Sequence, residues 1–247
     1  MATTIAKVRA SLNPDVVRND CLALRIVRPI ANAITPPFIE LGVSANAITV
    51  IRVLISAAAL AVLAFSGAGE WYFVLPAFYL AFVLDCVDGN VARLSASVTY
   101  WGKFLDGLGD NVYAAFAPAA AAIGVWSKSG SNLALFVGLA ATAGALLNQC
   151  VRYRLSFFRE WMTAETGALT ESESGTRRPY QRFEDQLARS WVNLTFLAIL
   201  ILPVGLNEYM WALAAVHIPI DAAWIVSSIC QARRLLDRNR RSKYELR

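Results

Sequence analysis

The chain has 247 residues, of which 57% are hydrophobic and only 17% are charged. Soluble domains are roughly 45–50% apolar and about 25% charged, so this composition favours an integral membrane protein. The net charge of +5 would suit a nucleic-acid-binding protein, but the placement of the basic residues argues against that class. The four cysteines form no CxxC pair, so no thiolate metal site is predicted.

The N-terminal segment, 1–44, is predicted to lie on the cytoplasmic face of the membrane as an amphipathic helix. Asn13 is a suitable N-cap, and Pro14 suits the first turn of a helix. The apolar residues that follow have helical spacing, and the helix is expected to end near Pro29. The alternative is a solvated arm. Charged residues interrupt the first forty positions, so no cleavable signal peptide is expected.

Six later segments are long and apolar enough, or nearly so, to cross a bilayer, which requires about 20 residues per helix. They run over 46–66, 71–94, 99–126, 132–156, 189–206 and 209–232. The expected fold is therefore an all-α integral membrane protein, with six transmembrane helices within a domain at 45–232. A basic cytoplasmic tail, 233–247, follows it.

The basic residues gather at one end of these spans. They occur before the first span, after the second and fourth, and in the tail, whereas the opposite turns hold only Lys128. The positive-inside rule then places both termini, the 95–98 turn and the 159–188 loop in the cytoplasm of a multi-pass protein, in the inner membrane if the source is bacterial. Topology and anionic lipid account for the positive charge, so nucleic acid is not expected as a partner.

The stretch from 84 to 110 places four carboxylates at the cytoplasmic end of the second and third predicted spans. Asp85 and Asp88 are three residues apart, Asp106 and Asp110 are four apart, and each pair therefore shares one helix face. A short turn between antiparallel helices would bring the pairs together. Four acids near a membrane repel one another unless cations lie among them, and oxygen-rich sites suit Mg²⁺ or Mn²⁺.

Small residues flank these acids, and an arginine follows them. Gly89, Ala92 and Gly102 leave room beside the acids, and Arg93 offers a planar fork for phosphate. Together they predict a metal-bridged phosphate pocket. In the alternative, the glycines only pack helices and the acids pair with Arg93 and Lys103. Two cations against four acids leave negative charge uncompensated, which favours the pocket.

The pattern from Asp85 to Asp110 resembles the signature of the CDP-alcohol phosphatidyltransferase family. It reads Asp-x-x-Asp-Gly-x-x-Ala-Arg, eight residues, then Gly-x-x-x-Asp-x-x-x-Asp, with all eight fixed positions present at the family spacing. The segment SANAITVIR, 44–52, is similar to the family's Asn-x-x-Thr start of the first span, through Asn46, Thr49 and Arg52. It departs from the family at Ala45, where a proline is usual.

The resemblance implies an enzyme of phospholipid biosynthesis. A hydroxyl would attack the β-phosphorus of a CDP-linked donor, and CMP would leave. The preferred candidate for this donor is CDP-diacylglycerol. The resemblance also implies two Mg²⁺ or Mn²⁺ ions held by Asp85, Asp88, Asp106 and Asp110, with Asp110 as the general base, and a homodimer. The implied contacts to the CDP donor come from Asn46, Thr49, Gly89, Ala92, Arg93, Thr99 and Gly102.

The acceptor, a small alcohol or a phosphorylated polyol, is not identified by the sequence. Arg152, Arg154 and Arg189 are candidates for a second anion site, and the alternative is that they are ordinary membrane anchors. Asn148, Asn193 and Asp221 either contact a polyol or bond across helices.

Two other functional classes are consistent with acidic residues in a membrane protein. A cation transporter would spread its acids through the depth of the membrane, and a non-catalytic CDP-lipid-binding protein would not release CMP. Metal-dependent CMP release from a CDP-lipid distinguishes both from the enzyme.

Overall fold

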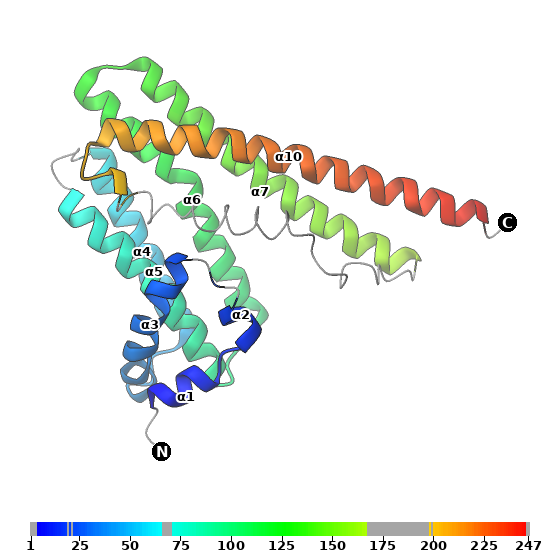
Figure 1. Cartoon of the computed structure of the whole chain (residues 1–247), viewed down its shortest axis with the longest axis horizontal. Coiled ribbons are helices and arrows are strands. Elements are labelled where there is room, and N and C mark those ends of the chain that lie inside the picture. Colours follow the sequence, from blue (N-terminus) through cyan, green and yellow to red (C-terminus); the bar gives the residue numbers. More distant parts are fainter. Residues whose placement is uncertain are drawn as a thin grey trace.

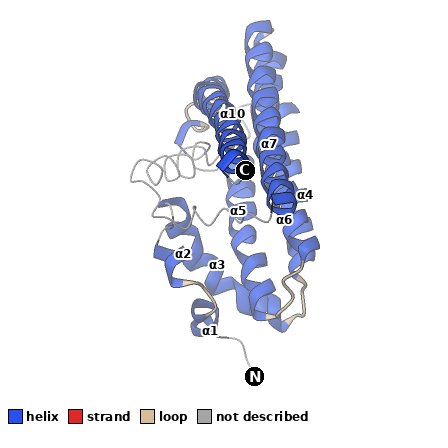
Figure 2. Ribbon diagram, turned by 90° about the vertical axis from the view of Figure 1, so that its right-hand side faces the viewer, coloured by secondary structure: helices blue, strands red, loops and turns tan. Residues whose placement is uncertain are grey.

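The computed structural model of the chain describes residues 4–18, 20, 22–65, 71–166, 198 and 200–245. All the elements within these ranges are helices, as the sequence predicts (Figures 1 and 2). They are α1 (Ile5–Ala10), α2 (Pro14–Arg18), α3 (Leu22–Glu40), α4 (Ala45–Phe65), α5 (Trp71–Leu94), α6 (Tyr100–Ser129), α7 (Asn132–Thr166) and α10 (Leu206–Glu245).

Four helices of the described part are long and apolar enough to cross a membrane. They cover Ala45–Phe65, Tyr72–Leu94, Asn132–Met162 and Leu206–Arg234, and they confirm four of the six predicted spans. The predicted third span, now α6, is not among them, because its first turns are charged and its remainder is rich in alanine rather than leucine. The predicted fifth span, 189–206, lies largely outside the described residues. The count of six therefore stays a prediction.

The N-terminal segment folds differently from the predicted single helix. A helix does begin at Pro14, but it ends at Arg18, and α3 then runs through Pro29 to Glu40. The predicted end near Pro29 is thus wrong. Pro29 lies on the exposed side of α3, while Val27 and Ala31 on the opposite side are buried, and this packing holds the helix together across the proline.

Within the described residues, buried apolar side chains form two clusters. One joins α4, α5, α6 and α10, around Leu63, Phe78 and Tyr209. The other joins α3 to the first turns of α4 and the last turns of α5, around Ile48 and Val87. The second cluster fixes the ends of α4 and α5 that carry the acidic motif.

The helices α7 and α10 are parallel neighbours that extend away from the rest of the bundle (Figures 1 and 2). Asn148 Nδ2 donates to Asp221 Oδ1 (2.6 Å), and Arg159 Nη2 donates to Gln231 Oε1 (2.8 Å). For Asn148 and Asp221, the structure therefore shows the bond across helices, whereas Asn193 lies outside the described residues. At 35 and 40 residues, both helices exceed the roughly 30 Å apolar core of a bilayer, since each residue adds about 1.5 Å.

Candidate active site

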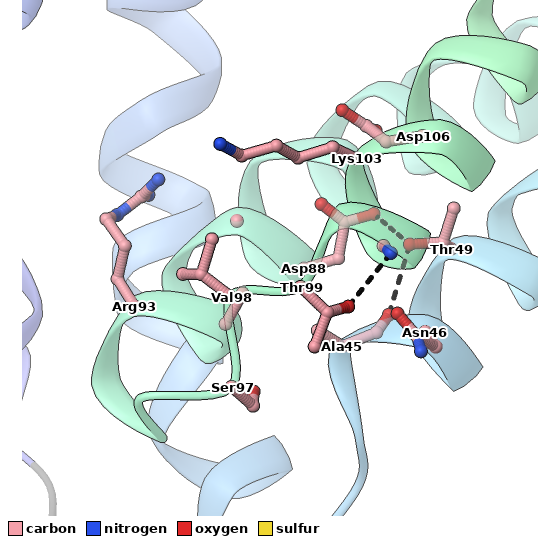
Figure 3. A pocket seen from close by; sticks show the side chains of 13 residues that line it. Ala45, Asn46, Thr49, Asp88, Arg93, Ser97, Val98, Thr99, Lys103 and Asp106 are labelled. Carbon is pink, nitrogen blue, oxygen red and sulfur yellow. Dashed lines mark hydrogen bonds between the residues drawn. The ribbon is translucent and has the colours of Figure 1, made fainter.

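The acidic motif lies where the first turns of α4, the last turns of α5 and the first turns of α6 meet. A cavity of about 230 Å³ opens there (Figure 3). Its lining includes Asp88, Asp106 and Lys103 together with every residue predicted to contact the CDP donor. Those residues are Asn46, Thr49, Gly89, Ala92, Arg93, Thr99 and Gly102. Residues 60 positions apart in the chain are thus brought to one cavity.

A tight turn between α5 and α6 reverses the chain beside this cavity. Ala96 has a φ of +48°, and the Ser97 N–H donates to the Ala92 carbonyl (3.0 Å), which closes the end of α5. Thr99 is the N-cap of α6, and its hydroxyl accepts from the Gly102 N–H (3.0 Å). The N-terminus of α6 therefore borders the cavity, and helix N-termini favour anions.

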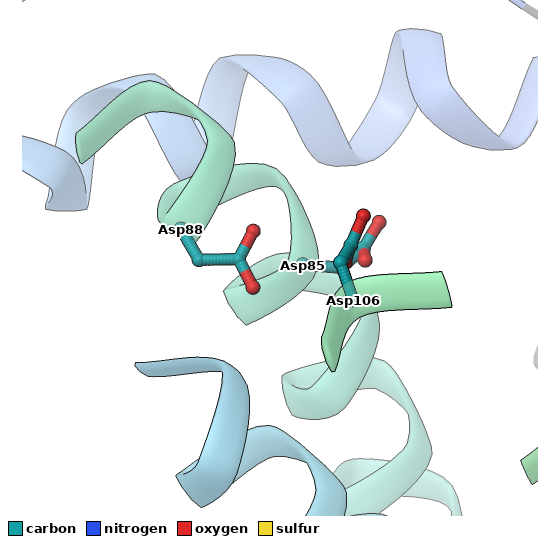
Figure 4. A group of neighbouring side chains, drawn as sticks. All are labelled: Asp85, Asp88 and Asp106. Carbon is teal, nitrogen blue, oxygen red and sulfur yellow. The ribbon is translucent and has the colours of Figure 1, made fainter. Parts of the chain in front are cut away.

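Three of the four predicted metal ligands converge in space. One carboxylate oxygen from each of Asp85, Asp88 and Asp106 lies within 4.8 Å of the others (Figure 4). Asp88 is buried, and the other two are partly exposed. Three convergent carboxylates form the donor set that hard divalent cations require, so the cluster could hold a metal ion. Asp110 lies one turn beyond Asp106 in α6, but its side chain lies outside the described residues.

The cation that lies among these acids is Arg52 of α4. Its Nη1 is 2.5 Å from Asp85 Oδ1, and its Nη2 is 2.9 Å from Asp106 Oδ1. Its Nε is 4.0 Å from Asp88 Oδ2. The alternative, in which the acids pair with Arg93 and Lys103, is therefore wrong for Asp85, Asp88 and Asp106. Arg52 follows Thr49 by three positions on a helix, a spacing that could have placed it on the same face.

Thr49 and the motif glycines shape the surroundings of the charged groups. The Thr49 hydroxyl donates to Asp88 Oδ2 (2.7 Å), so it orients an acid as well as lining the cavity. A Cβ at Gly89 would lie 3.2 Å from Arg93 Nη1, and one at Gly102 would lie 3.1 Å from Asn46 Oδ1. Both glycines thus leave room for polar side chains of the cavity.

With this geometry in place, comparison with known proteins identifies the family. The family model of CDP-alcohol phosphatidyltransferase matches residues 42–222. The chain belongs to the CDP-alcohol phosphatidyltransferase family. This confirms the resemblance found in the sequence and the expected enzyme class, a transferase of substituted phosphate groups.

The fold agrees with that of a solved structure, the phosphatidylinositol phosphate synthase (PgsA1) of Mycobacterium tuberculosis with CDP-DAG bound. The two share 16% sequence identity, with a TM-score of 0.54, over 84% of this chain and 94% of the other. No curated protein sequence matches the chain.

In this phosphatidyltransferase, the predicted acceptor arginines do not share one face of α7. The guanidinium of Arg152 lies over the Trp224 ring of α10, and that of Arg154 lies over Phe157 of its own helix, each at 5.4 Å from the ring centroid. Residues two apart are separated by about 200° around a helix. Arg189 lies outside the described residues.

Sequence reasoning missed Tyr153, which lies between these two arginines. Its hydroxyl is 3.6 Å from the position of a Cβ at Gly107, the residue that follows Asp106. This face of α7 therefore fronts the acidic end of α6, and Arg152 and Arg154 flank it. The position of Tyr153 between two arginines at the end of a predicted span is the signal that could have identified it from the sequence.

Proposed function

We propose that this chain transfers the phosphatidyl group of CDP-diacylglycerol to the hydroxyl of an alcohol acceptor and releases CMP, in phospholipid biosynthesis. The observation that carries the proposal is the single cavity that collects every motif residue expected to contact CDP, beside three convergent carboxylates. The structural likeness to a synthase with CDP-DAG bound supports the choice of donor.

Asp85, Asp88 and Asp106 are the proposed ligands of two divalent ions, Mg²⁺ or Mn²⁺, with Asp110 as the fourth acid. When bound, such ions would neutralise the pyrophosphate and stabilise the entering and leaving oxygens. Arg52 would hold Asp85 and Asp106 in position for them, and the Thr49 hydroxyl would hold Asp88.

The remaining cavity residues are proposed to bind and orient the donor. Arg93 presents a planar fork, and Lys103 a second cation, toward the negative pyrophosphate. Asn46 and Thr49 close one side of the cavity, and Gly89, Ala92, Thr99 and Gly102 give the cytidine and phosphates close access to the helix backbones.

The proposed reaction is a displacement at the β-phosphorus. The acceptor oxygen forms a new bond to that phosphorus, and the bond to the oxygen that bridges the two phosphates breaks. CMP departs with that bridging oxygen, and Asp110 takes the proton from the acceptor hydroxyl.

For the acceptor, we infer a phosphorylated polyol. Tyr153 directs one face of α7 toward the acids, and Arg152 and Arg154 flank this face, with Arg189 as a further candidate. The positive charges of Arg152 and Arg154, on either side of this face, would attract the phosphate of the acceptor. Alanine at Arg152 or Arg154 should then raise the KM for the acceptor and leave the KM for the donor unchanged.

The proposed setting is a cytoplasmic active site in a six-span membrane domain with both termini cytoplasmic, and we retain the homodimer as a proposal. The N-terminal segment is proposed to lie on the membrane surface, because α3 exposes the apolar residues Ile26 and Ile30 next to its buried side. Residues 233–245 of the basic tail form the last turns of α10, which runs without a break to Glu245.

The test is CMP release from CDP-diacylglycerol by the purified protein in detergent, with a panel of alcohols and phosphorylated polyols scored by product mass. Release that requires both an alcohol and a divalent ion is the expected result. Absence of release with every acceptor would overturn the enzymatic proposal and favour a CDP-lipid-binding protein. Cation flux through vesicles without CMP release would favour a transporter.

A further inference from the structure

A chain of buried hydrogen bonds connects α3 to Arg93 at the wall of the cavity. Arg93 Nη2 donates to Asn90 Oδ1 (2.8 Å). Asn90 Nδ2 in turn donates to Asn32 Oδ1 (3.1 Å) and to Thr35 Oγ1 (3.0 Å) of α3. The N-terminal segment is therefore tied by side chains to a residue that the donor is proposed to touch.

The hydrogen-bond donors and hydrogen-bond acceptors of this network allow one consistent arrangement. A guanidinium has no acceptor, so Asn90 must turn its oxygen toward Arg93 and its nitrogen toward α3. The Thr35 hydroxyl donates to the Ala31 carbonyl (2.6 Å), which leaves its oxygen lone pairs for Asn90. Each polar group thus restricts the orientation of the next.

Burial prevents water from replacing these partners. The exposed fraction is 1% for Asn90, 4% for Asn32 and 0% for Thr35. An unpaired amide at this depth is unfavourable, so Asn90 stays in the orientation that α3 imposes. Val27 and Ala31 also pack α3 against α5 through apolar contacts, but such contacts do not orient a polar group.

The family signature does not specify any of these three residues. Asn90 occupies an unspecified position of the motif, and Asn32 and Thr35 precede residue 42, where the family match begins. The guanidinium of Arg93 passes over Gly89, where a Cβ would lie 3.2 Å from Nη1. Asn90 therefore adds a directed contact to a guanidinium that the motif glycine leaves room for.

We propose that Asn90, held by Asn32 and Thr35, is a positioning residue that fixes the Arg93 guanidinium at the cavity wall for the pyrophosphate of the donor. This inference rests on the proposed function, in which Arg93 contacts that group. Without Asn90 in this orientation, the long Arg93 side chain samples other rotamers, and donor binding must then order it.

The test removes the two hydrogen-bond acceptors on α3, Asn32 and Thr35, without changing α5. The N32A/T35V double variant should raise the KM for CDP-diacylglycerol by about tenfold, the scale of one hydrogen bond to a charged group. The KM for the alcohol acceptor should stay within about twofold of wild type, since none of the residues in this hydrogen-bond network is proposed to face the alcohol acceptor. T35S, which keeps the hydroxyl, is the matched control and should behave as wild type.

The R93A background separates the inference from the proposed function. R93A alone should raise the donor KM, and adding N32A/T35V to it should raise that KM no further, because the two changes act through one group. If R93A leaves the donor KM unchanged, the proposed role of Arg93 fails.

If R93A raises the donor KM but N32A/T35V does not, the positioning role fails while the proposed function stands. A double variant that raises both KM values alike also overturns the positioning role, since that is the effect of a general structural change. Should the double variant not fold, N32A and T35V singly should each raise the donor KM about threefold in wild type but not in R93A.

Discussion

Arg52 Nη1 lies 2.5 Å from Asp85 Oδ1, so a permanent positive charge from α4 is placed within the proposed metal site. Its side chain is only 7% exposed and also contacts Asp106. A buried cation among carboxylates reduces their mutual repulsion before any metal binds. Arg52 therefore offsets part of the negative charge of Asp85, Asp88 and Asp106.

Replacing Arg52 with glutamine should make folding depend on metal. R52Q leaves three close carboxylates without their cation, and breaking such a pair costs about 3 kcal/mol. The expected result is a lower melting temperature in EDTA, with a larger increase on adding Mg²⁺ than wild type shows. R52K, which keeps the charge, is the control. Equal Mg²⁺ stabilisation of R52Q and wild type would contradict this role.

Removal of divalent cations should abolish activity in the wild-type protein. Asp85, Asp88 and Asp106 surround one arginine, Arg52, so the cluster keeps a net negative charge beside the place where the pyrophosphate is proposed to bind. A divalent ion in the cluster would remove this repulsion. CMP release should therefore stop with excess EDTA and return with Mg²⁺ or Mn²⁺. Full activity in EDTA would refute the metal assignment, and a parallel assay with Ca²⁺ chelated selectively serves as the control.

Gly109 should be essential for the contact between α6 and α4 because a side chain there has no space. A Cβ at Gly109 would lie 2.6 Å from Val53 Cγ2 and 3.4 Å from Arg52 Nη2. G109A should therefore destabilise the protein by about 1–3 kcal/mol, as overpacking does, and lower activity by moving Arg52. The V53A/G109A double variant should recover part of both losses, as measured by thermal unfolding and CMP release. If the double variant recovers neither stability nor activity, the G109A methyl group does not clash mainly with Val53.

The predicted orientation can be checked by labelling single cysteines in a cysteine-free background. The basic residues favour a cytoplasmic end for α10 and an outer position for the turn after α6. In intact cells, R240C should resist an impermeant maleimide, whereas S131C should react with it. Opening the cells should make R240C reactive. Labelling of R240C from outside intact cells would show that the topology is inverted.

Much of the site could be predicted from the sequence because its acids are close to one another in the chain. Asp85 and Asp88 share a helix, and one short turn separates them from Asp106, so spacing alone brings the acids near one another. The residues that complete the site come from elsewhere in the chain. Arg52 and Thr49 meet the acids only through the packing of α4 against α5 and α6, which residue spacing within one helix does not specify.

The N-terminal helices show the opposite situation, in which a local signal misled. Pro29 is a common end of a helix, but α3 continues because one side is buried against α5 and the proline lies on the exposed side. Asn32 and Thr35 then become parts of a buried network with Asn90, whose partners lie 55 and 58 residues away. Such pairs leave no periodic signal in one sequence, so they required the structure.

Asp110 is the residue for which the sequence makes the sharpest prediction. Its backbone lies in α6 one turn after Asp106, at the position expected for the general base. D110N keeps the size and a neutral oxygen ligand but cannot accept a proton. A positioned general base contributes about 10²–10⁴-fold, so kcat should fall by at least about a hundredfold. The affinity for CDP-diacylglycerol should persist, because Asp85, Asp88 and Asp106 remain as ligands.

The matched comparison is D85N, which removes one carboxylate of the observed cluster and the closest partner of Arg52. It should weaken metal and donor binding together, so that the KM for the donor and the Mg²⁺ concentration for half-maximal activity both rise. In D110N, by contrast, kcat alone should fall. Near-normal turnover of D110N, or a loss of donor binding as complete as that of D85N, would show that Asp110 is not the base. The acceptor proton would then have to pass directly to water or to another group.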